Sequence, residues 1–181
     1  TYDLCKRLHA QKVLILTNRP AIANSWYDDY VKFVGTKGGY WFVSGVDAVA
    51  GRKYCVSRDE YRDLLQREEG PIGCIEFVSL QDLKGSSYFG GYHDKLEEVA
   101  NLEWDILVID EAHEGVDTFK TDVAFNQINR KFTLHLSGTP FKAIANEKFP
   151  EDAIFNWTYA DEQQAIGMIR SCRTRMRTCR G

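Results

Sequence analysis

The stretch that decides the fold is residues 101–116, Asn-Leu-Glu-Trp-Asp-Ile-Leu-Val-Ile-Asp-Glu-Ala-His-Glu-Gly-Val. Its centre, residues 106–109, is a short unbroken apolar run, the pattern of a strand buried on both faces of a parallel sheet. Three ionisable residues, Asp110, Glu111 and His113, follow at once. Unpaired charge is costly to bury, and ligands bind at the carboxyl ends of strands in open α/β sheets. This strand end is therefore a candidate site.

Similar apolar runs elsewhere predict a set of strands that alternates with helices. The further strands are expected at 13–16, 40–43, 74–78, 132–136 and 154–159. The helices are expected at 1–9, 21–33, 57–67, 93–100, 122–128 and 161–169. Such alternation implies right-handed crossovers and a mostly parallel sheet, so the predicted fold class is α/β.

Local signals predict how some of these helices begin and which faces they bury. Ser57 followed by Glu60 is a capping box at the start of the third helix. The inward-facing residues expected from helical spacing are Leu4, Cys5 and Leu8, then Ile22, Trp26, Tyr30 and Phe33, and finally Leu96 and Val99.

Composition indicates a globular domain in a reduced setting. Of the 181 residues, 44% are apolar and 27% charged, and the net charge of −3 leaves room for a local basic groove. The five cysteines form no CxxC pair, and neither a signal peptide nor a membrane-spanning run is visible. We therefore expect a cytoplasmic protein without a membrane partner, in which Cys5 and Cys74 fill the core.

Three predicted strands end in polar sequences, which are Thr17-Asn18-Arg19, Asp110-Glu111-Ala112-His113 and Ser137-Gly138-Thr139. In a parallel sheet these ends converge on one edge. Asp110 suits a hydrated magnesium ion, which prefers oxygen ligands, and Glu111 could orient or deprotonate an attacking water. The alternative for Asp110 and Glu111 is a solvated acidic loop, and His113 alone is more often a structural histidine.

These motifs together resemble superfamily-two DEAH/DEAD-box helicases and translocases. Residues 106–113 look like their Walker B or DEAH motif, and residues 137–140, Ser-Gly-Thr-Pro, resemble motif III in the form seen in restriction-enzyme motor subunits of type I and type III. Residues 16–20 look like motif Ia, and residues 78–81 resemble a further motif that touches the nucleic-acid backbone. The resemblance covers residues 1 to about 160 and implies a three-layer RecA-like domain of the P-loop NTPase class.

The resemblance also implies roles for single residues. Asp110 would bind Mg²⁺, Glu111 would activate the water that attacks ATP, and His113 would connect the nucleotide site to motif III. There Ser137, Gly138 and Thr139 would couple hydrolysis to movement on nucleic acid. The residues along the nucleic-acid path would be Thr17, Asn18, Arg19, Ser79 and Gln81, binding phosphates without sequence preference. Arg19 could instead be a surface or helix-start residue, and Ser79 and Gln81 could serve ordinary capping and turn roles.

One part of the family pattern is absent, because residues 1–181 contain no G-x-x-x-x-G-K-[ST] phosphate loop. We expect that loop just upstream of a sequence that opens inside a helix, and a second RecA-like domain in the same chain. The expected domain limits are 1–160 for the first motor domain and 161–181 for a terminal helix and an arginine-rich tail. That tail could bind nucleic acid or be a non-native ending.

The sequence therefore predicts a fragment of an ATP-dependent translocase acting on double-stranded DNA, with ATP and Mg²⁺ as cofactors. A methylation or specificity subunit is a further partner that the resemblance allows, and the fragment alone is expected to be inactive. Two alternatives stay open, a nucleic-acid-binding module of the same fold without ATP turnover and a related ATPase switch that does not act on nucleic acid.

Overall fold

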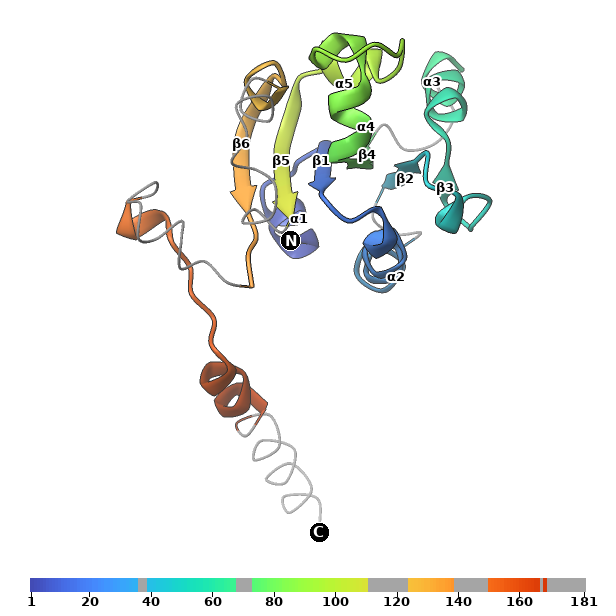
Figure 1. Ribbon diagram of the computed structural model, residues 1–181. Coiled ribbons are helices and arrows are strands. Elements are labelled where there is room, and N and C mark those ends of the chain that lie inside the picture. Colours follow the sequence, from blue (N-terminus) through green and yellow to red (C-terminus); the bar gives the residue numbers. More distant parts are fainter. Residues whose placement is uncertain (36–38, 68–72, 111–123, 139–149, 167, 169–181) are drawn as a thin grey trace. The chain divides into compact units, whose positions relative to one another are not determined.

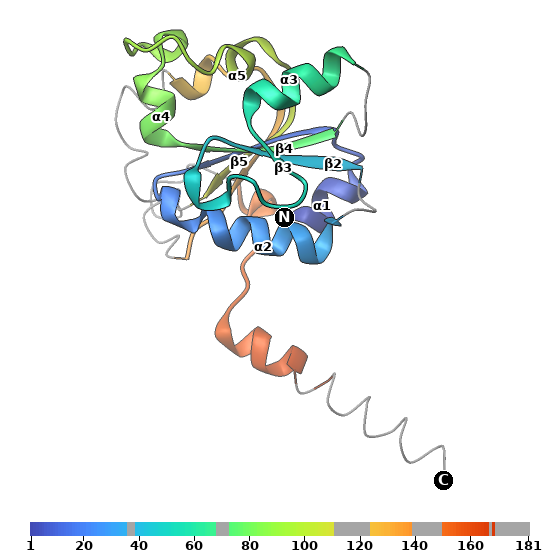
Figure 2. The same ribbon diagram turned by 90° about the vertical axis from the view of Figure 1, so that its right-hand side faces the viewer.

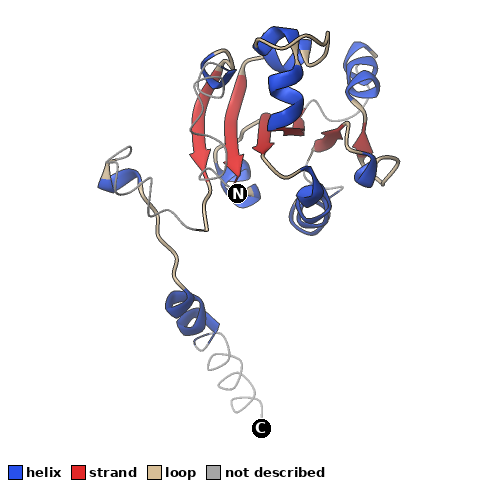
Figure 3. Ribbon diagram, viewed as in Figure 1, coloured by secondary structure: helices blue, strands red, loops and turns tan. Residues whose placement is uncertain are grey.

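The computed structural model describes residues 1–35, 39–67, 73–110, 124–138, 150–166 and 168, in two compact units, Thr1–Pro140 and Phe141–Gly181. The first unit is built on a six-stranded parallel sheet with strand order β3-β2-β4-β1-β5-β6 (Figure 1 and Figure 3). Its strands are β1 (Lys12–Thr17), β2 (Tyr40–Ser44), β3 (Cys55–Val56), β4 (Gly73–Ser79), β5 (Trp104–Asp110) and β6 (Arg130–His135). The predicted α/β class is confirmed. The two-residue strand β3 was not among the predicted strands.

Helices cover both faces of this sheet, which gives the three layers that were predicted (Figure 2). One face carries α1 (Tyr2–Arg7) and α2 (Ala23–Phe33), and the other carries α3 (Arg58–Gln66), α4 (Leu80–Gly85) and α5 (Glu97–Asn101). Short 3₁₀ turns lie at η1 (Pro20–Ile22), η3 (Asp47–Val49), η4 (Ser87–Phe89) and, in the second unit, η5 (Glu151–Ala153). Among the described residues, no helix combines the length and apolar character needed to cross a membrane.

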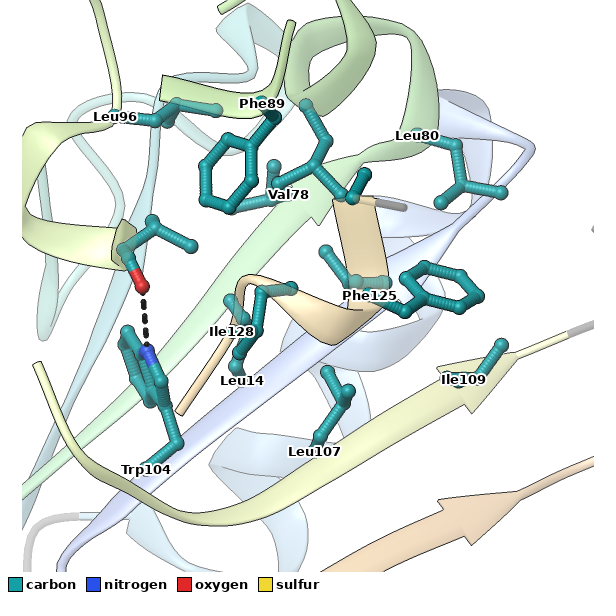
Figure 4. Close-up of a cluster of buried hydrophobic side chains, with 14 of the residues drawn as sticks. Leu14, Val78, Leu80, Phe89, Leu96, Trp104, Leu107, Ile109, Phe125 and Ile128 are labelled. Atoms are coloured by element: carbon teal, nitrogen blue, oxygen red, sulfur yellow. Dashed lines mark hydrogen bonds between the residues drawn. The ribbon is translucent and has the colours of Figure 1, made fainter. Parts of the chain in front are cut away.

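Strand β5 explains the unbroken apolar run in the sequence. Ile106 and Val108 pack with α1 and α2, whereas Leu107 and Ile109 point to the opposite face, toward the cluster drawn in Figure 4. All four side chains are at most 1% exposed. Burying a side chain of this size contributes about 1.5–3 kcal/mol, so the four together contribute roughly 6–12 kcal/mol.

The three cysteines within the described residues, Cys5, Cys55 and Cys74, are free and buried. This confirms that Cys5 and Cys74 fill the core. Burial raises the pKa of the Cys74 thiol to about 12, so this cysteine stays protonated at neutral pH.

The predicted capping box is confirmed at the start of α3. The Ser57 hydroxyl accepts from the Glu60 amide, and the Glu60 carboxylate accepts from the Ser57 amide at 2.7 Å. The next residue, Arg58, reaches into the sheet and donates to the buried Glu76 carboxylate of β4 at 2.7 Å. Arg58 Nε also lies 3.4 Å from Glu98 Oε1, so this guanidinium joins α3, β4 and α5.

Two predicted helix faces are wrong in part. In α1 the buried residues are Tyr2 and Cys5, whereas Leu4 and the C-cap Leu8 are 39% and 48% exposed. The chain enters α2 through η1, which ends at Ile22. The buried residues of α2 are Ala23, Tyr27 and Tyr30, whereas Ile22 and Trp26 are half-buried and Phe33 is exposed. The helix therefore packs through the stripe beside the predicted one, and this places the Trp26 indole next to Asp110.

The end of the described chain also differs from its prediction. Residues 154–158 form no strand, and a helix already begins at 159. Thr158 explains this start, because its amide donates to Asp161 Oδ2 at 2.8 Å and its hydroxyl accepts from the Asp161 amide at 3.2 Å. This reciprocal cap ends the extended run. Helix α5 is likewise shorter than the predicted 93–100, although Leu96 and Val99 are buried as expected.

Candidate functional site

Three of the predicted site residues lie in one row across the sheet. Thr17 on β1 is in register with Ser79 on β4 and with Asp110 on β5. The arrowheads of β1, β5 and β6 point to the same edge in Figure 1. Because consecutive parallel strands lie close together, about 4.8 Å apart, this row brings residues far apart in sequence together at one end of the sheet.

The motif III segment reaches the same edge from β6. His135 pairs with Ile109, and the Leu136 amide then donates to the Ile109 carbonyl at 2.9 Å. Ser137 and the exposed Gly138 follow directly, so the convergence of the three polar strand ends is confirmed. Glu111, His113 and Thr139 lie outside the described residues.

The carboxylate of Asp110 is fixed by a tryptophan. The Trp26 indole Nε1 donates to Asp110 Oδ2 at 2.8 Å. Trp26 is fixed in turn by Tyr2, whose hydroxyl donates to the Trp26 carbonyl at 2.7 Å and whose ring meets the indole edge-on. The half-buried Asp110 is therefore held at a set position beside α1 and α2.

Asp110 borders a cavity of about 410 Å³ between α1, α2 and the end of β5, lined by Thr1, Tyr2, Asp3, Ile22, Ser25, Trp26, Asp29, Phe33 and Asp110. Its described lining includes three carboxylates and three aromatic rings, and none of these lining residues is basic. A polyphosphate entering here would meet repulsion from these acids. Binding would need cations, such as a metal ion and basic side chains from outside this lining.

The donor chemistry at Asp110 fits magnesium. This ion keeps several waters and takes one or two protein carboxylates together with phosphate oxygens, so it does not need a cage of side chains. The described residues contain no cluster of three or more histidine, cysteine, aspartate or glutamate side chains that could enclose a metal.

Two of the five residues predicted to contact nucleic acid are buried, with their hydroxyls in local turns. Thr17 Oγ1 accepts from the Arg19 amide at 3.1 Å. Ser79 is the N-cap of α4, where its Oγ accepts from the Asp82 amide at 3.0 Å and donates to Asp82 Oδ2 at 2.9 Å. The capping alternative for Ser79 is therefore the arrangement that is observed.

The acid that bonds to Ser79 is itself held by a lysine. Lys95 Nζ donates to Asp82 Oδ1 at 2.7 Å. Partial burial acts to raise the pKa of Asp82, but the hydrogen bonds from Lys95 and Ser79 outweigh it and lower this pKa overall. At neutral pH the start of α4 is therefore held by an ionised Asp82 that bonds to both Ser79 and Lys95.

The other three predicted contact residues, Asn18, Arg19 and Gln81, are exposed at the same edge. Arg19 immediately precedes η1, which is the helix-start position of its alternative interpretation. These exposed side chains follow the buried Thr17 and Ser79 in the chain, and a ligand that crosses this edge could touch them.

Sequence reasoning missed the role of Trp26 as the partner of Asp110, since helical spacing placed it among core residues. One signal was available. An indole N–H needs an acceptor when it is buried, and Trp26 follows the polar end of β1, which neighbours β5.

Comparison with known proteins agrees with this architecture. Residues 1–142 match the family model described as type III restriction enzyme, res subunit. The chain is also 24% identical, over 205 aligned residues, to a Mycoplasma pneumoniae protein named as the C-terminus of a proposed type II restriction enzyme and methyltransferase. That alignment covers 91% of this chain and 26% of the relative, so the chain spans about a quarter of the relative's length.

Proposed function

The chain belongs to the family of type III restriction enzyme res subunits, and from this premise we propose that it is the first RecA-like domain of an ATP-dependent DNA translocase. The family supports a restriction-type, helicase-like module with a P-loop NTPase fold and hydrolase activity in general. The proposal adds ATP as the nucleotide, double-stranded DNA as the track and the residue roles given below.

The observation that carries the proposal is the row of Ser79, Thr17 and Asp110 at one sheet edge, with the end of β6 beside it. Asp110 would hold Mg²⁺ at the cavity, and the ion would neutralise charge on the ATP phosphates. Glu111 would take the proton of the attacking water, and His113 would link this centre to motif III. Phosphoryl transfer needs mainly positioning and charge stabilisation, which such groups supply.

The acidic lining of the cavity supports a nucleotide site to which other parts of a longer protein contribute the phosphate-binding groups. The phosphates of ATP need hydrogen-bond donors, which a phosphate loop supplies. Residues 1–181 contain no such loop, and the cavity lining is acidic. We propose that residues outside this sequence provide the loop and that a second RecA-like domain of the same chain completes the site. On this proposal residues 1–160 are the motor domain, and residues 1–181 alone hydrolyse ATP at a negligible rate.

The proposed nucleic-acid path runs along the same edge. Asn18, Arg19 and Gln81 would contact phosphates with their side chains, while Thr17 and Ser79 would shape the turns that present them. Ser137, Gly138 and Thr139 would couple the nucleotide state to this path. By analogy with the restriction and methylation functions named for the relative, a methylation or specificity subunit is the proposed further partner.

The decisive experiment measures ATPase activity of the intact protein with and without duplex DNA. Asp110→Asn and Glu111→Gln should each lower the DNA-stimulated rate at least 100-fold, because each removes a proposed catalytic carboxylate. Glu103→Gln is the matched control, since Glu103 is an exposed acid just before β5, at the opposite edge of the sheet, and should leave the rate unchanged.

Three outcomes would overturn parts of this proposal. Full activity of Glu111→Gln would remove Glu111 as the catalytic carboxylate. ATP hydrolysis that duplex DNA, single-stranded DNA and RNA all fail to stimulate would favour an ATPase switch that does not use nucleic acid. DNA binding without any ATP hydrolysis in the intact wild-type protein would favour a binding module without turnover.

A further inference from the structure

The hydrogen bond between Trp26 and Asp110 joins two elements that the proposed mechanism treats separately. Trp26 lies on α2, and Asp110 ends β5 84 positions later in the chain. The bond of 2.8 Å is partly buried. An indole N–H is only a donor, so it cannot exchange roles with water or a phosphate as a hydroxyl can.

Trp26 is itself held in place from a third element. The Tyr2 hydroxyl of α1 donates to the Trp26 carbonyl, and the two rings meet edge-on with centroids 5.7 Å apart at 87°. Tyr2 is 5% exposed, so this contact lies inside the packed layer between the helices. The indole therefore presents its N–H to Asp110 from a fixed position.

This arrangement has a chemical consequence for the carboxylate. An ionised carboxylate accepts through two oxygens, and the bond from Trp26 occupies a site on Oδ2 and restrains rotation of the group. Outer hydrogen bonds of this kind orient metal ligands, and their loss costs about 10–100-fold in metal affinity. A restrained Asp110 would meet a hydrated cation without first losing side-chain freedom.

The polar end of β1 lies beside Asp110 through strand pairing. Thr17 is in register with Asp110, and the exposed Asn18 and Arg19 lead directly into η1 and α2.

We propose that Trp26 is a positioning residue that orients Asp110 for its metal ion. This inference rests on the proposed function, because it takes Asp110 as the magnesium ligand. It adds a residue that lies outside all the motifs.

The test compares Trp26→Phe with the wild type in the intact protein. Phenylalanine keeps an aromatic ring for Tyr2 and removes the N–H. Binding of Mn²⁺, the probe used in place of Mg²⁺, is measured by electron paramagnetic resonance of the free ion in the presence of a non-hydrolysable ATP analogue. We expect the Mn²⁺ dissociation constant to rise about 10–100-fold. The Mg²⁺ concentration for half-maximal ATPase should rise with it, while kcat at saturating Mg²⁺ changes little.

Trp41→Phe is the matched control. Trp41 is also half-buried, but its Nε1 has no hydrogen-bond partner among the described residues and it lies on β2, two strands away from β1. The same substitution there removes no bond to a site residue and should leave Mn²⁺ binding unchanged.

If Trp26→Phe fails to fold, Tyr2→Phe provides the second variant, because it removes only the hydroxyl that fixes the Trp26 backbone. We expect a smaller rise of the Mn²⁺ dissociation constant in the same direction. Wild-type Mn²⁺ affinity in a folded Trp26→Phe or Tyr2→Phe protein would overturn the inference. If Asp110→Asn also left Mn²⁺ affinity unchanged, the proposed function of Asp110 would fail instead, so the two failures are distinguishable.

Discussion

Strand β5 has two parallel neighbours, β1 and β6, which share its hydrogen-bonding pattern but differ in their surroundings. On β1, five of six residues are buried, whereas on β6 four of six are exposed. Leu14, opposite Leu107, is fully buried, whereas Phe132, opposite Ile106, is 59% exposed. We call β1 with β4 the packed side of β5, and β6 the open side.

The difference in burial between β1 and β6 indicates how firmly each part of the candidate site is held. Thr17, Ser79 and Asp110 end strands of the packed side or β5 itself, so core packing on both faces fixes their positions. Ser137 and Gly138 follow a strand that is held mainly by its bonds to β5. Regions with fewer buried contacts open at a lower free energy, so we expect the end of β6 to be displaced more easily than the ends of β1 and β4.

The largest expected effect compares core truncations on the two sides. Leu14→Ala should lower the free energy of unfolding by about 2–5 kcal/mol, because it leaves a cavity in a fully packed layer. Phe132→Ala on the open side should cost less than about 1 kcal/mol, since its ring is largely solvated. Urea unfolding followed by circular dichroism measures both. Equal losses would show that the open side is as well packed as the other.

A second prediction concerns the buried Glu76 of the packed side. Burial raises its pKa to about 7, from an ordinary value near 4.5, although Arg58 favours the charged form. The folded protein therefore holds this proton more tightly than the unfolded chain. The free energy of unfolding should fall by about 1–3 kcal/mol as the pH rises from 5 to 8, and no further above that range.

Glu76→Gln is the variant that isolates this pH effect, because the amide oxygen can still accept from Arg58 but cannot titrate. Urea unfolding at each pH from 5 to 8 should give a nearly constant stability for this variant. A wild-type slope that survives the substitution would assign the pH dependence to another group.

The smallest expected effect compares the stability contributed by the bonds to each carboxylate oxygen of Asp105, at the start of β5. Oδ2 accepts from the Gln11 and Lys12 amides on the packed side at 2.7 and 3.0 Å, and Oδ1 accepts from Lys131 on the open side at 2.7 Å. Asp105→Ala should cost about 1–2 kcal/mol, because it removes the bonds to both amides.

The partner variant, Lys131→Ala, should change stability only slightly, and its effect should vanish in high salt, since this lysine is solvent-exposed. Thermal unfolding at low and high salt compares the two variants. A larger loss for Lys131→Ala than for Asp105→Ala would reverse the order that the packed and open sides predict.

Much of the packed side could be predicted from sequence, for physical reasons. An apolar run such as 13–16 is typical of a strand buried on both faces, and the capping box of Ser57 and Glu60 is a local interaction complete within four residues. The convergence of polar strand ends followed from parallel topology. For these features, local sequence and tertiary structure agree.

Other features depended on contacts that no local pattern contains. The run 132–136 predicted a strand correctly, but its exposure depends on what covers β6. Residues 154–159 alternate as a strand would, yet no ladder pairs them in the described structure, and the Thr158 cap starts a helix there. The partnership of Trp26 with Asp110 depends on which face α2 turns toward β5, and that is a tertiary contact.

The interior position of β1 has a consequence for how the chain is made. β1 is the first strand of these 181 residues, yet it lies between β4 and β5, and its contact from Gln11 to Asp105 spans 94 positions. Contacts so distant in sequence form slowly because a long loop must close first. A ribosome adds about 5–20 residues per second, so residues 12–17 wait on the order of ten seconds for β5. During that time the apolar residues 13–16 have two open strand edges and are exposed to mispairing.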